Sequence, residues 1–472
     1  TVHFPIWHKE IEDIIVLKNN KGTEDNRVRK LDYSIQLSKL FYERFINDEE
    51  ITLFSPHEVP ELYEAWGSPE FDELYKAAER KTSVSKTKVS AQTLFMDMLK
   101  ERAETGRIYI MNIDHCNTHS SFKDKITMSN LCQEITLPTD PIQHIDGAGE
   151  IALCILSAIN VGKVNNVDEL EPLCELAVRS LDEIIDHQLY PVKAAEVSTK
   201  ARRSLGIGYI GLAHYIAKNK LKYSDKGAWK LVDELTEAFQ FYLLKHSNEL
   251  AKEKGKNEFF DRTKYSDGIL PIDTYKPEVD EIVKRKLSYD WEWLRKEIKK
   301  HGLRHSTLSA QMPSESSSVV SNATNGIEPP RDYLSIKKSK KGTLKQIVPQ
   351  YATLKNNYTL LWDMASNEGY INIVAVMQKY FDQAISGNWS YNPENYEDNQ
   401  VPVSVMAQDL LSTYRLGWKT SYYQNTYDAK KDIDEPTHPV GWADNVKENP
   451  VERTEFNGTD EEYEEYCESC TI

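Results

Sequence analysis

Apolar residues recur every three or four positions in three long segments, which predicts amphipathic helices there. The segments are residues 167–188, 229–251 and 289–301, and Gly302 supplies a stop signal after the third. Residues 31–45 show the same helical spacing over a shorter stretch. We therefore expect helices at all four places.

Short segments rich in apolar or β-forming residues lie between these helices. Residues 107–113 (RIYIMNI) predict a strand, and residues 130–137 and 151–160 are further short segments of this kind. Residues 416–426 form another run, with the adjacent Tyr422 and Tyr423 near its end, and adjacent aromatic residues usually pack within a strand. Strands that alternate with helices predict an α/β architecture.

The composition is that of a globular protein. Of the 472 residues, 40% are apolar and 28% are charged, which excludes wholesale disorder and fibrous repeats. The mean hydropathy is −0.59, and no run of about 18 apolar residues occurs, so we expect no membrane partner. The net charge of −16 argues against nucleic acid as a partner.

Much of this negative charge belongs to the end of the chain. Residues 427–472 carry 14 acidic and 4 basic side chains and show neither helical nor strand periodicity. We expect two parts: a folded unit over residues 1–426 and a flexible acidic tail over residues 427–472.

Six cysteines are too few for a disulfide scaffold in a chain of this length. Residues 1–5 (TVHFP) lack the basic start and apolar stretch of a signal peptide. We therefore expect a reducing, cytoplasmic location, where a cysteine is catalytic, metal-binding or buried.

Two motifs favour structural roles. Gly206, Gly208 and Gly211 match G-x-G-x-x-G, but the preceding residues 198–205 (STKARRSL) are basic and do not resemble a buried strand. Close packing at a helix start is the favoured interpretation of these glycines.

A second cluster places a cysteine between two histidines four positions apart, as His115, Cys116 and His119. Structural zinc needs four ligands, usually in paired clusters, and no second cluster lies nearby in the sequence. A hydrogen-bonded turn is favoured over a metal site, and we expect no metal there.

The segment 129–135 (SNLCQEI) carries more chemistry. If it is extended, Asn130, Cys132 and Glu134 alternate onto one face. They would offer a positioning donor, a sulfur reactant and a general base together. A buried cysteine with chance polar neighbours is the alternative, and the segment alone does not decide between them.

Two further segments have both a structural and a chemical interpretation. Residues 313–318 (PSESSS) fit the first turn of a helix, whose free N–H groups suit a phosphate, although a simple cap is commoner. Cys467 and Cys470 form C-x-x-C in the acidic tail, where a dithiol that shuttles electrons is favoured over zinc because no further ligands are close.

Taken together, these segments resemble the C-terminal part of the large catalytic subunit of class I ribonucleotide reductase, over nearly the whole chain. The blocks that carry the resemblance are residues 130–134 (NLCQE), 203–208 (RSLGIG), 291–313, 312–317 (MPSESS), 321–330 (SNATNGIEPP), 422–426 (YYQNT) and the terminal cysteine pair.

The resemblance implies the second half of a ten-stranded α/β barrel with a central finger loop, followed by a helical C-terminal region. It implies that Cys132 becomes a thiyl radical that abstracts the 3′ hydrogen of a ribonucleoside diphosphate. Glu134 would accept the 3′-hydroxyl proton, Asn130 would hold substrate hydroxyls, and Cys154 would be one of two reducing thiols.

The resemblance also implies how substrate and electrons arrive. The substrate diphosphate would bind at Ser314, Glu315, Ser316 and Ser317. Tyr422 and Tyr423 would relay the radical from a small diiron-tyrosyl subunit. Cys467 and Cys470 would re-reduce the spent disulfide and be reduced in turn by thioredoxin or glutaredoxin.

Some family features have no counterpart in this sequence. The second reducing thiol, the effector-reading loops for dNTP and ATP, and the first barrel half are expected on a separate N-terminal portion, so this chain alone should bind no cofactor and should not turn over. The complete large subunit is expected to be a homodimer. Cys116 and Cys174 match no catalytic role, and burial is their expected state.

Two other functions stay open. One is a binding module that only completes a split reductase. The other is a metal-binding protein that uses the tail cysteine pair together with histidines.

Overall fold

The first group of strands forms a four-stranded sheet that includes the first strand of the chain. In a computed structural model, which describes residues 1–428 except 20, 22, 24, 26, 145–148, 340 and 341, this sheet has the strand order β1-β2-β5-β11. Strands β1 (Val2–Pro5), β2 (Tyr33–Leu37) and β5 (Ile108–Asn112) run parallel, and β11 (Thr420–Ser421) pairs antiparallel with β5. Every residue of β2 and β5 is buried, as is typical of strands covered on both faces.

A second group of parallel segments carries the other half of the fold. Strand β6 (Ile155–Asn160) pairs with β7 (Leu205–Ile210). A parallel bridge joins Ile207 of β7 to Ser309, and another joins Gln311 to Ile385. Two extended segments, around residues 309–311 and 383–386, therefore continue this group beyond β7.

The remaining strands are short. They are β3 (Glu50–Phe54), β4 (Lys86–Ser90), β8 (Leu334–Ser339), β9 (Gly342–Ile347), β10 (Trp389–Tyr391) and β12 (Gln424–Thr426). Strands β3 and β4 pair antiparallel, as do β8 and β9, whereas β10 and β12 pair parallel.

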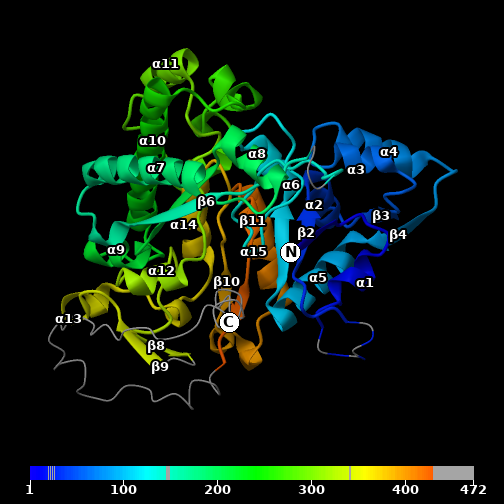
Figure 1. Cartoon of the computed structure of the whole chain (residues 1–472). Helices are drawn as coiled ribbons and strands as arrows, with labels where there is room; N and C mark the ends of the chain where they lie inside the picture. Colours follow the sequence, from blue (N-terminus) through cyan, green and yellow to red (C-terminus); the bar gives the residue numbers. More distant parts are fainter. Residues whose placement is uncertain are drawn as a thin grey trace.

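Helices surround both strand groups. Figure 1 shows the early helices on one side, α7 and α10 on the other, and α14, α15 and β11 between them. The helices are α1 (Ile11–Ile15), α2 (Lys39–Ile46), α3 (Pro60–Ala65), α4 (Phe71–Arg80), α5 (Ala91–Thr105), α6 (Ile113–Thr118), α7 (Leu170–His187), α8 (Lys193–Arg202), α9 (Leu212–Lys218), α10 (Lys226–Lys254), α11 (Trp291–His301), α12 (Glu315–Val320), α13 (Tyr351–Leu354), α14 (Glu368–Gln378) and α15 (Val403–Arg415).

Helices α10 and α14 pack against each other in the core. Ten of the eleven residues of α14 are buried, so this helix lies inside the molecule with little amphipathic pattern. No helix in the described ranges is long and apolar enough to cross a membrane.

The three long helices predicted from periodicity are confirmed as α7, α10 and α11, and Gly302 ends α11 with a φ of +77°. The strand predicted over residues 107–113 is confirmed as β5, and the later half of 151–160 is β6. The mixed α/β character is therefore confirmed, while the pairing of the described strands leaves separate sheets and no closed barrel.

Three segments differ from the prediction. Residues 31–45 are not one helix but β2 followed by α2, because a strand buried on both faces loses its alternation. Residues 130–137 contain a turn and no strand. Residues 416–426 form two short strands, β11 and β12, and Tyr422 and Tyr423 occupy the break between them.

The glycines of the G-x-G-x-x-G match lie in β7 and at the start of α9. A Cβ at Gly206 would lie 2.8 Å from the Cys154 sulfur, and one at Gly208 would lie 2.7 Å from the carbonyl oxygen of Ala310. Gly211 precedes α9 with a φ of +80°. Packing at a helix start is confirmed for Gly211. At Gly206 and Gly208, the lack of a side chain lets neighbouring chain segments approach closely.

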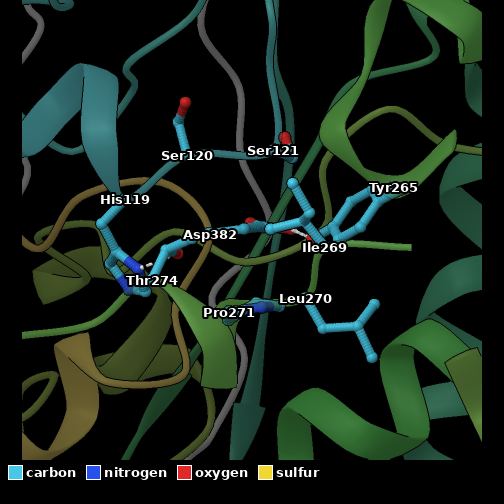
Figure 2. Close-up of a pocket in the computed structure, with 9 residues that line it drawn as sticks. All are labelled: His119, Ser120, Ser121, Tyr265, Ile269, Leu270, Pro271, Thr274 and Asp382. Atoms are coloured by element: carbon cyan, nitrogen blue, oxygen red, sulfur yellow. Dashed lines mark hydrogen bonds between the residues drawn. The ribbon is translucent and has the colours of Figure 1, made fainter. Parts of the chain in front are cut away.

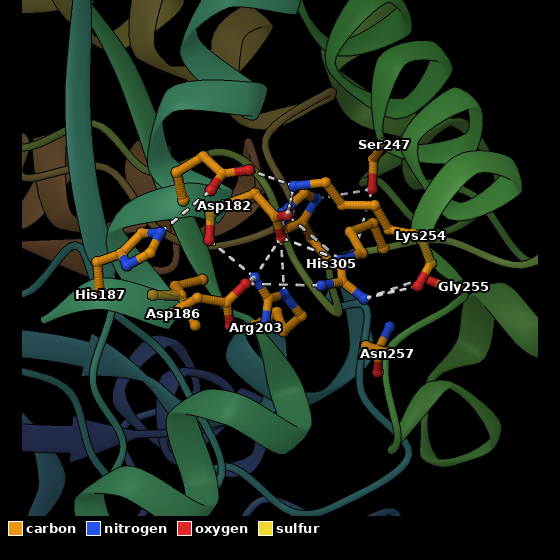
Figure 3. Close-up of polar contacts among 12 residues, drawn as sticks. Asp182, Asp186, His187, Arg203, Ser247, Lys254, Gly255, Asn257 and His305 are labelled. Atoms are coloured by element: carbon orange, nitrogen blue, oxygen red, sulfur yellow. Dashed lines mark hydrogen bonds and ion pairs between the residues drawn. The ribbon is translucent and has the colours of Figure 1, made fainter.

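A buried charged cluster ties the second strand group to its helices (Figure 3). The Asp182 carboxylate on α7 is fully buried and accepts hydrogen bonds from Arg203 at 2.7 Å and from Arg304 at 3.1 Å. His305 Nε2 lies 3.1 Å from the same carboxylate, and its Nδ1 lies 2.9 Å from the Ser247 hydroxyl on α10. The cluster therefore joins α7, α10 and the entrances to β7 and the 309–311 segment.

Candidate functional site

The segment that carries Asn130, Cys132 and Glu134 is a tight turn and not an extended strand. Gln133 has a φ of +71°, the left-handed conformation that a turn requires. Asn130 closes the turn, because its side-chain oxygen accepts from the Ile135 N–H at 3.1 Å and its own N–H donates to the Ile135 carbonyl at 3.2 Å. The predicted alternation was wrong, since a left-handed residue breaks it.

The turn still brings the predicted polar groups together. Asn130 and Glu134 are joined by a side-chain hydrogen bond. Gln133, which the sequence analysis assigned no role, is fully buried and accepts from the Ser34 hydroxyl of β2 at 3.0 Å. This hydrogen bond fixes the turn to the first sheet and leaves Cys132 at its tip.

Glu134 is 2% exposed, and its carboxylate has a defined set of partners. Burial raises the pKa of Glu134, while hydrogen bonds from Asn130, from its own backbone and from Ser386 oppose that rise. The Ser386 hydroxyl lies 3.1 Å from Glu134 Oε2. A carboxylate in this setting can accept a proton from a neighbouring group near neutral pH.

Tyr422 and Tyr423 form a stacked pair that reaches the turn. Their ring centroids are 3.8 Å apart, and the Tyr422 hydroxyl lies 3.5 Å from the Cys132 sulfur. Arg107 donates to the Tyr423 hydroxyl at 2.9 Å and lies over its ring. Tyr109 stands beside both rings, 4.9 Å from that of Tyr422. Two phenols and a thiol are therefore in continuous contact.

The phenols are held in their protonated form. Burial raises the pKa of Tyr422, and the nearby Cys132 raises it further. Burial also raises the pKa of Tyr423, against the opposing effects of the Tyr422 hydroxyl and Arg107. Both hydroxyls therefore keep their protons at neutral pH.

Cys154 lies immediately before β6, in the second strand group. Gln383 donates to its sulfur at 3.5 Å, and Gly206 of β7 leaves room for it. Desolvation raises the pKa of Cys154, and the charge of Glu134 acts in the same direction. Cys154 and the turn thus face a common region.

The segment 382–386 connects these parts, and the sequence analysis missed it. Gln383 donates to the Leu205 carbonyl at 2.9 Å as well as to Cys154, and the Ala384 N–H donates to the Glu134 carbonyl at 3.0 Å. Ser386 reaches both Glu134 and the Cys132 carbonyl. The signal that could have found it is a set of polar residues, Asp382, Gln383 and Ser386, that follows the largely apolar segment 370–377 within a few positions.

Asp382 holds the start of this segment in place. Its carboxylate accepts from the N–H groups of Leu308 and Ser309, both at 2.9 Å, and from the Tyr265 hydroxyl at 2.8 Å. Figure 2 shows Asp382 beside a cavity that also includes His119 and Thr274. The cavity measures about 10 Å³, far below the several hundred Å³ of a substrate pocket, so its residues support the fold.

The predicted phosphate site lies at the end of the 309–311 segment. Helix α12 begins at Glu315 with Ser314 as its N-cap, which confirms the predicted helix start. Ser314 is buried and its hydroxyl donates to the Met312 carbonyl at 3.0 Å, whereas Ser316 and Ser317 are exposed. The exposed Ser316 and Ser317 offer hydroxyl groups that can contact an anion at this edge.

His115 and Cys116 lie in the short helix α6, and His119 is the residue that follows its end. His115 Nδ1 lies 2.9 Å from the Trp418 carbonyl oxygen, and His119 Nε2 lies 2.7 Å from that of Gln378. The hydrogen-bonded interpretation is confirmed, in a helix and not a turn. Cys116 is buried, as is Cys174, which confirms the expectation for both.

Elsewhere in the described part of the chain, no group of three or more His, Cys, Asp or Glu side chains is placed to hold a metal ion. Cys467 and Cys470 lie outside the described residues.

Comparison with known proteins identifies the family. The family model for the ribonucleotide reductase barrel domain matches residues 1–424. The chain is 56% identical over 441 residues to the ribonucleoside-diphosphate reductase subunit alpha of Haemophilus influenzae, covering 92% of this chain and 58% of that protein.

Two further relatives carry similar names. The chain is 53% identical to subunit alpha of ribonucleoside-diphosphate reductase 1 from Escherichia coli, covering 93% of this chain and 58% of the relative. It is 44% identical to the subunit alpha of Enterobacteria phage T4, covering 91% of this chain and 57% of the relative. The chain therefore spans a little under three fifths of these relatives' length, and it belongs to the ribonucleotide reductase barrel-domain family.

Proposed function

We propose that this chain carries the radical chemistry of a ribonucleoside-diphosphate reductase alpha subunit, which converts ribonucleoside diphosphates to deoxyribonucleoside diphosphates. The observation that carries the proposal is the contact of the Tyr422 hydroxyl with the Cys132 sulfur, next to the buried Glu134. A buried phenol, a thiol and a carboxylate in one place suit the transfer of a hydrogen atom and of a proton.

Cys132 is the proposed hydrogen-atom acceptor. Its thiyl radical takes a hydrogen atom from the 3′ carbon of the substrate, so an S–H bond forms as a C–H bond breaks. Glu134, whose pKa is raised by burial, takes the proton of the 3′-hydroxyl, and Asn130 holds substrate hydroxyls. The adjacent radical then eases loss of the 2′-hydroxyl, which leaves as water after protonation.

Cys154 is proposed as one of the two thiols that supply the reducing electrons. Desolvation raises its pKa, which suits a thiol that gives up a proton together with an electron. The second thiol is proposed to lie in the portion of the relatives that this chain does not span. Cys467 and Cys470 are proposed to reduce the resulting disulfide and then to exchange with thioredoxin or glutaredoxin.

Tyr423 and Tyr422 are the proposed radical relay. Their stacked rings and the 3.5 Å contact to Cys132 support a path along which each step moves an electron and a proton together. Tyr423 is the more exposed of the two and is the proposed side of entry from a small diiron-tyrosyl subunit.

The start of α12 is proposed to hold the substrate diphosphate through Ser314, Glu315, Ser316 and Ser317. The support is a backbone that begins a helix at Glu315, with two exposed hydroxyls beside it.

The two strand groups are proposed to be half of a ten-stranded barrel, with the 130–134 turn as its finger loop. An N-terminal portion of the subunit would supply the other strands and the dNTP or ATP effector sites, and the complete subunit would dimerise. The support is the share of the relatives' length that this chain spans, 58% in the Haemophilus protein.

The test is a reconstitution. The chain, joined to or mixed with the N-terminal portion of a relative, is combined with the small subunit, a ribonucleoside diphosphate and thioredoxin, and the deoxyribonucleotide product is measured. Product formation that depends on every component supports the proposal. A stable complex that forms no product would leave only the role of a binding module.

A further inference from the structure

Ser386 occupies an unusual position between two acceptors of the candidate site. Its hydroxyl oxygen lies 2.5 Å from the Cys132 carbonyl oxygen and 3.1 Å from Glu134 Oε2. The residue is 7% exposed, so water does not readily replace either contact. A hydroxyl has one proton and can donate to only one of these oxygens at a time.

The backbone around Ser386 is held from both sides. Its N–H donates to the Gln311 carbonyl at 3.0 Å, and the next residue, Gly387, accepts from the Tyr422 N–H at 2.8 Å. The Thr420 hydroxyl donates to the Ile385 carbonyl at 3.1 Å. These bonds fix the backbone at Ser386, and with the hydroxyl oxygen between its two acceptors the hydroxyl proton can point to either of them.

The state of Glu134 decides where that proton points. An ionised carboxylate only accepts, so the Ser386 hydroxyl donates to it. A protonated carboxyl donates its own proton to Ser386, whose hydroxyl then turns to the Cys132 carbonyl. Ser386 neither gains nor loses a proton in this exchange.

We propose that Ser386 is a positioning residue that couples the proton state of Glu134 to the backbone of the turn carrying Cys132. Its hydroxyl stabilises the ionised carboxylate of Glu134. Once Glu134 is protonated, the hydroxyl forms a stronger hydrogen bond to the Cys132 carbonyl. The inference rests on the proposed function of Glu134 as the acceptor of the substrate proton.

Other groups around Glu134 are consistent with this role. Asn130 and the Glu134 backbone N–H donate to the carboxylate on the turn itself. Cys154, from the strand side, lies close enough for its thiol to sense the Glu134 charge, and the Cys132 thiol is on the same turn. Of the donors, Ser386 is the one that also reaches the Cys132 carbonyl.

The first test needs no turnover. Infrared titration of the 472-residue chain follows the carbonyl band of protonated Glu134, which is assigned by its loss in Glu134→Gln. Ser386→Ala removes a donor to the charged form, so the midpoint should rise by about one pH unit. Ser386→Thr keeps the hydroxyl and should restore the wild-type midpoint.

The matched control is Ser306→Ala. Ser306 is a buried serine whose hydroxyl lies 3.2 Å from that of Ser204, just before β7. It should leave the midpoint unchanged. Ser386→Cys covers the case in which the alanine variant does not fold, since a thiol donates weakly and should give a smaller upward shift.

A second measurement separates coupling from simple support. With ¹³C at the cysteine carbonyls, the band that Cys132→Ser removes should move as Glu134 titrates in the wild type and stay still in Ser386→Ala. An unmoved band in the wild type, or an unchanged midpoint in both Ser386→Ala and Ser386→Cys, overturns the proposal.

Turnover of the complete subunit gives the link to catalysis. In Ser386→Ala the acid limb of the kcat profile should move upward by the same amount as the infrared midpoint, with KM unchanged. If the infrared shift appears but the pH profile does not follow, the coupling stands and the proposed role of Glu134 fails.

Discussion

The Tyr422 hydroxyl lies 3.5 Å from the sulfur of Cys132, although 290 positions separate the two residues in the chain. Strand pairing and a buried arginine set this contact. The Arg102 guanidinium donates to the carbonyls of Tyr422 at 2.8 Å and Tyr423 at 3.2 Å, and it also bonds to the Ile108 carbonyl of β5. The backbone of the tyrosine pair is therefore held in place independently of the contacts that its rings make.

Tyr422→Phe should stop nucleotide reduction in the reconstituted enzyme. Phenylalanine keeps the ring that stacks on Tyr423 but removes the O–H that faces Cys132. We expect turnover to fall at least about 1000-fold, which corresponds to about 4 kcal/mol, while substrate binding persists. Tyr423→Phe should behave in the same way.

Tyr223→Phe is the matched control for this pair. Tyr223 is also buried, and its hydroxyl donates to the Ile327 carbonyl at 2.7 Å, away from the turn. It should lower stability by about 1 kcal/mol and leave turnover near the wild-type rate. Normal rates in both Tyr422→Phe and Tyr423→Phe would reduce the pair to core packing.

Cys132→Ser should abolish reduction while the fold survives. The change is nearly isosteric at the tip of the turn, but an O–H bond is much stronger than an S–H bond and cannot replace it in reversible hydrogen transfer. The far-ultraviolet circular dichroism and the unfolding midpoint should match the wild type. Turnover at the wild-type rate in this variant would remove Cys132 from the mechanism.

Lys419→Met should impair both stability and the rate. Lys419 is fully buried, and its ammonium group donates to the carbonyls of Asp382 at 2.9 Å and Gln383 at 2.8 Å, which joins the start of β11 to the 382–386 segment. Burial lowers the pKa of Lys419 to about 7. Methionine leaves these carbonyls without their donor, so we expect a loss of about 2–4 kcal/mol and a lower kcat with KM unchanged.

Lys218→Met provides the comparison for Lys419. Lys218 also donates to two backbone carbonyls, those of Gly162 at 3.0 Å and Val164 at 2.9 Å, at the far end of β6. Urea unfolding should show a loss of stability here too, while kcat stays near the wild-type value. Equal effects on kcat in both variants would mean that general destabilisation explains the result.

The buried cluster around Asp182 should make stability depend on pH. Burial lowers the pKa of His305 from 6.5 to about 4, against the opposing hydrogen bond to Asp182, so the folded protein keeps this histidine neutral. The unfolded chain binds the proton at higher pH than the folded chain does. The stabilisation is complete above pH 6.5 and is lost as pH falls toward 4, by about 3 kcal/mol.

Urea unfolding across this pH range measures the effect, and His305→Gln should make the slope between pH 6.5 and 4 less steep, leaving the part that the buried His3 and His119 contribute. Asp182→Asn should cost about 3–5 kcal/mol at pH 7, because Arg203 and Arg304 lose a buried partner. Glu234→Gln, which removes an exposed ion pair with Lys230, should change stability by less than about 1 kcal/mol. A pH slope as steep in His305→Gln as in the wild type would contradict the assignment.

Changing Cys467 and Cys470 together to serine should separate two reductants. The first turnover should survive, because it uses thiols already reduced in the site. Later turnovers should fail with thioredoxin or glutaredoxin and recover at least partly with dithiothreitol, which is small enough to enter the site directly. Sustained activity with both kinds of reductant would remove the shuttle role, and loss of the first turnover would place these thiols in the chemistry itself.

The periodicity of apolar residues predicted those helices that face water on one side. Helices α7 and α11 have one buried stripe and one solvated face, and their periodicity is visible in the sequence. Strand β2 has no such contrast because all its residues are buried, so its apolar spacing resembled a helix. Helix α14 is also buried on all sides, so its sequence likewise lacks the contrast between a buried face and a solvated face.

The candidate catalytic residues of the turn could also be recognised from the sequence. Asn130, Cys132 and Glu134 stand within five positions, and a thiol between an amide and a carboxylate is distinctive wherever it folds. Their geometry was not visible, because the left-handed Gln133 replaces the expected alternation with a turn. Backbone conformation at a non-glycine residue leaves little trace in the sequence.

The sequence by itself determined the α/β character, the long helices and the identity of the thiol, the carboxylate and the paired phenols. Only the tertiary structure decided which of them touch. Ser386, Gln383 and Lys419 gain their importance from hydrogen bonds to groups that are 36 to 254 positions away in the chain. The packing of two strand groups around one turn brings these distant groups together. Periodicity along the chain reports only local burial, so it does not predict such contacts.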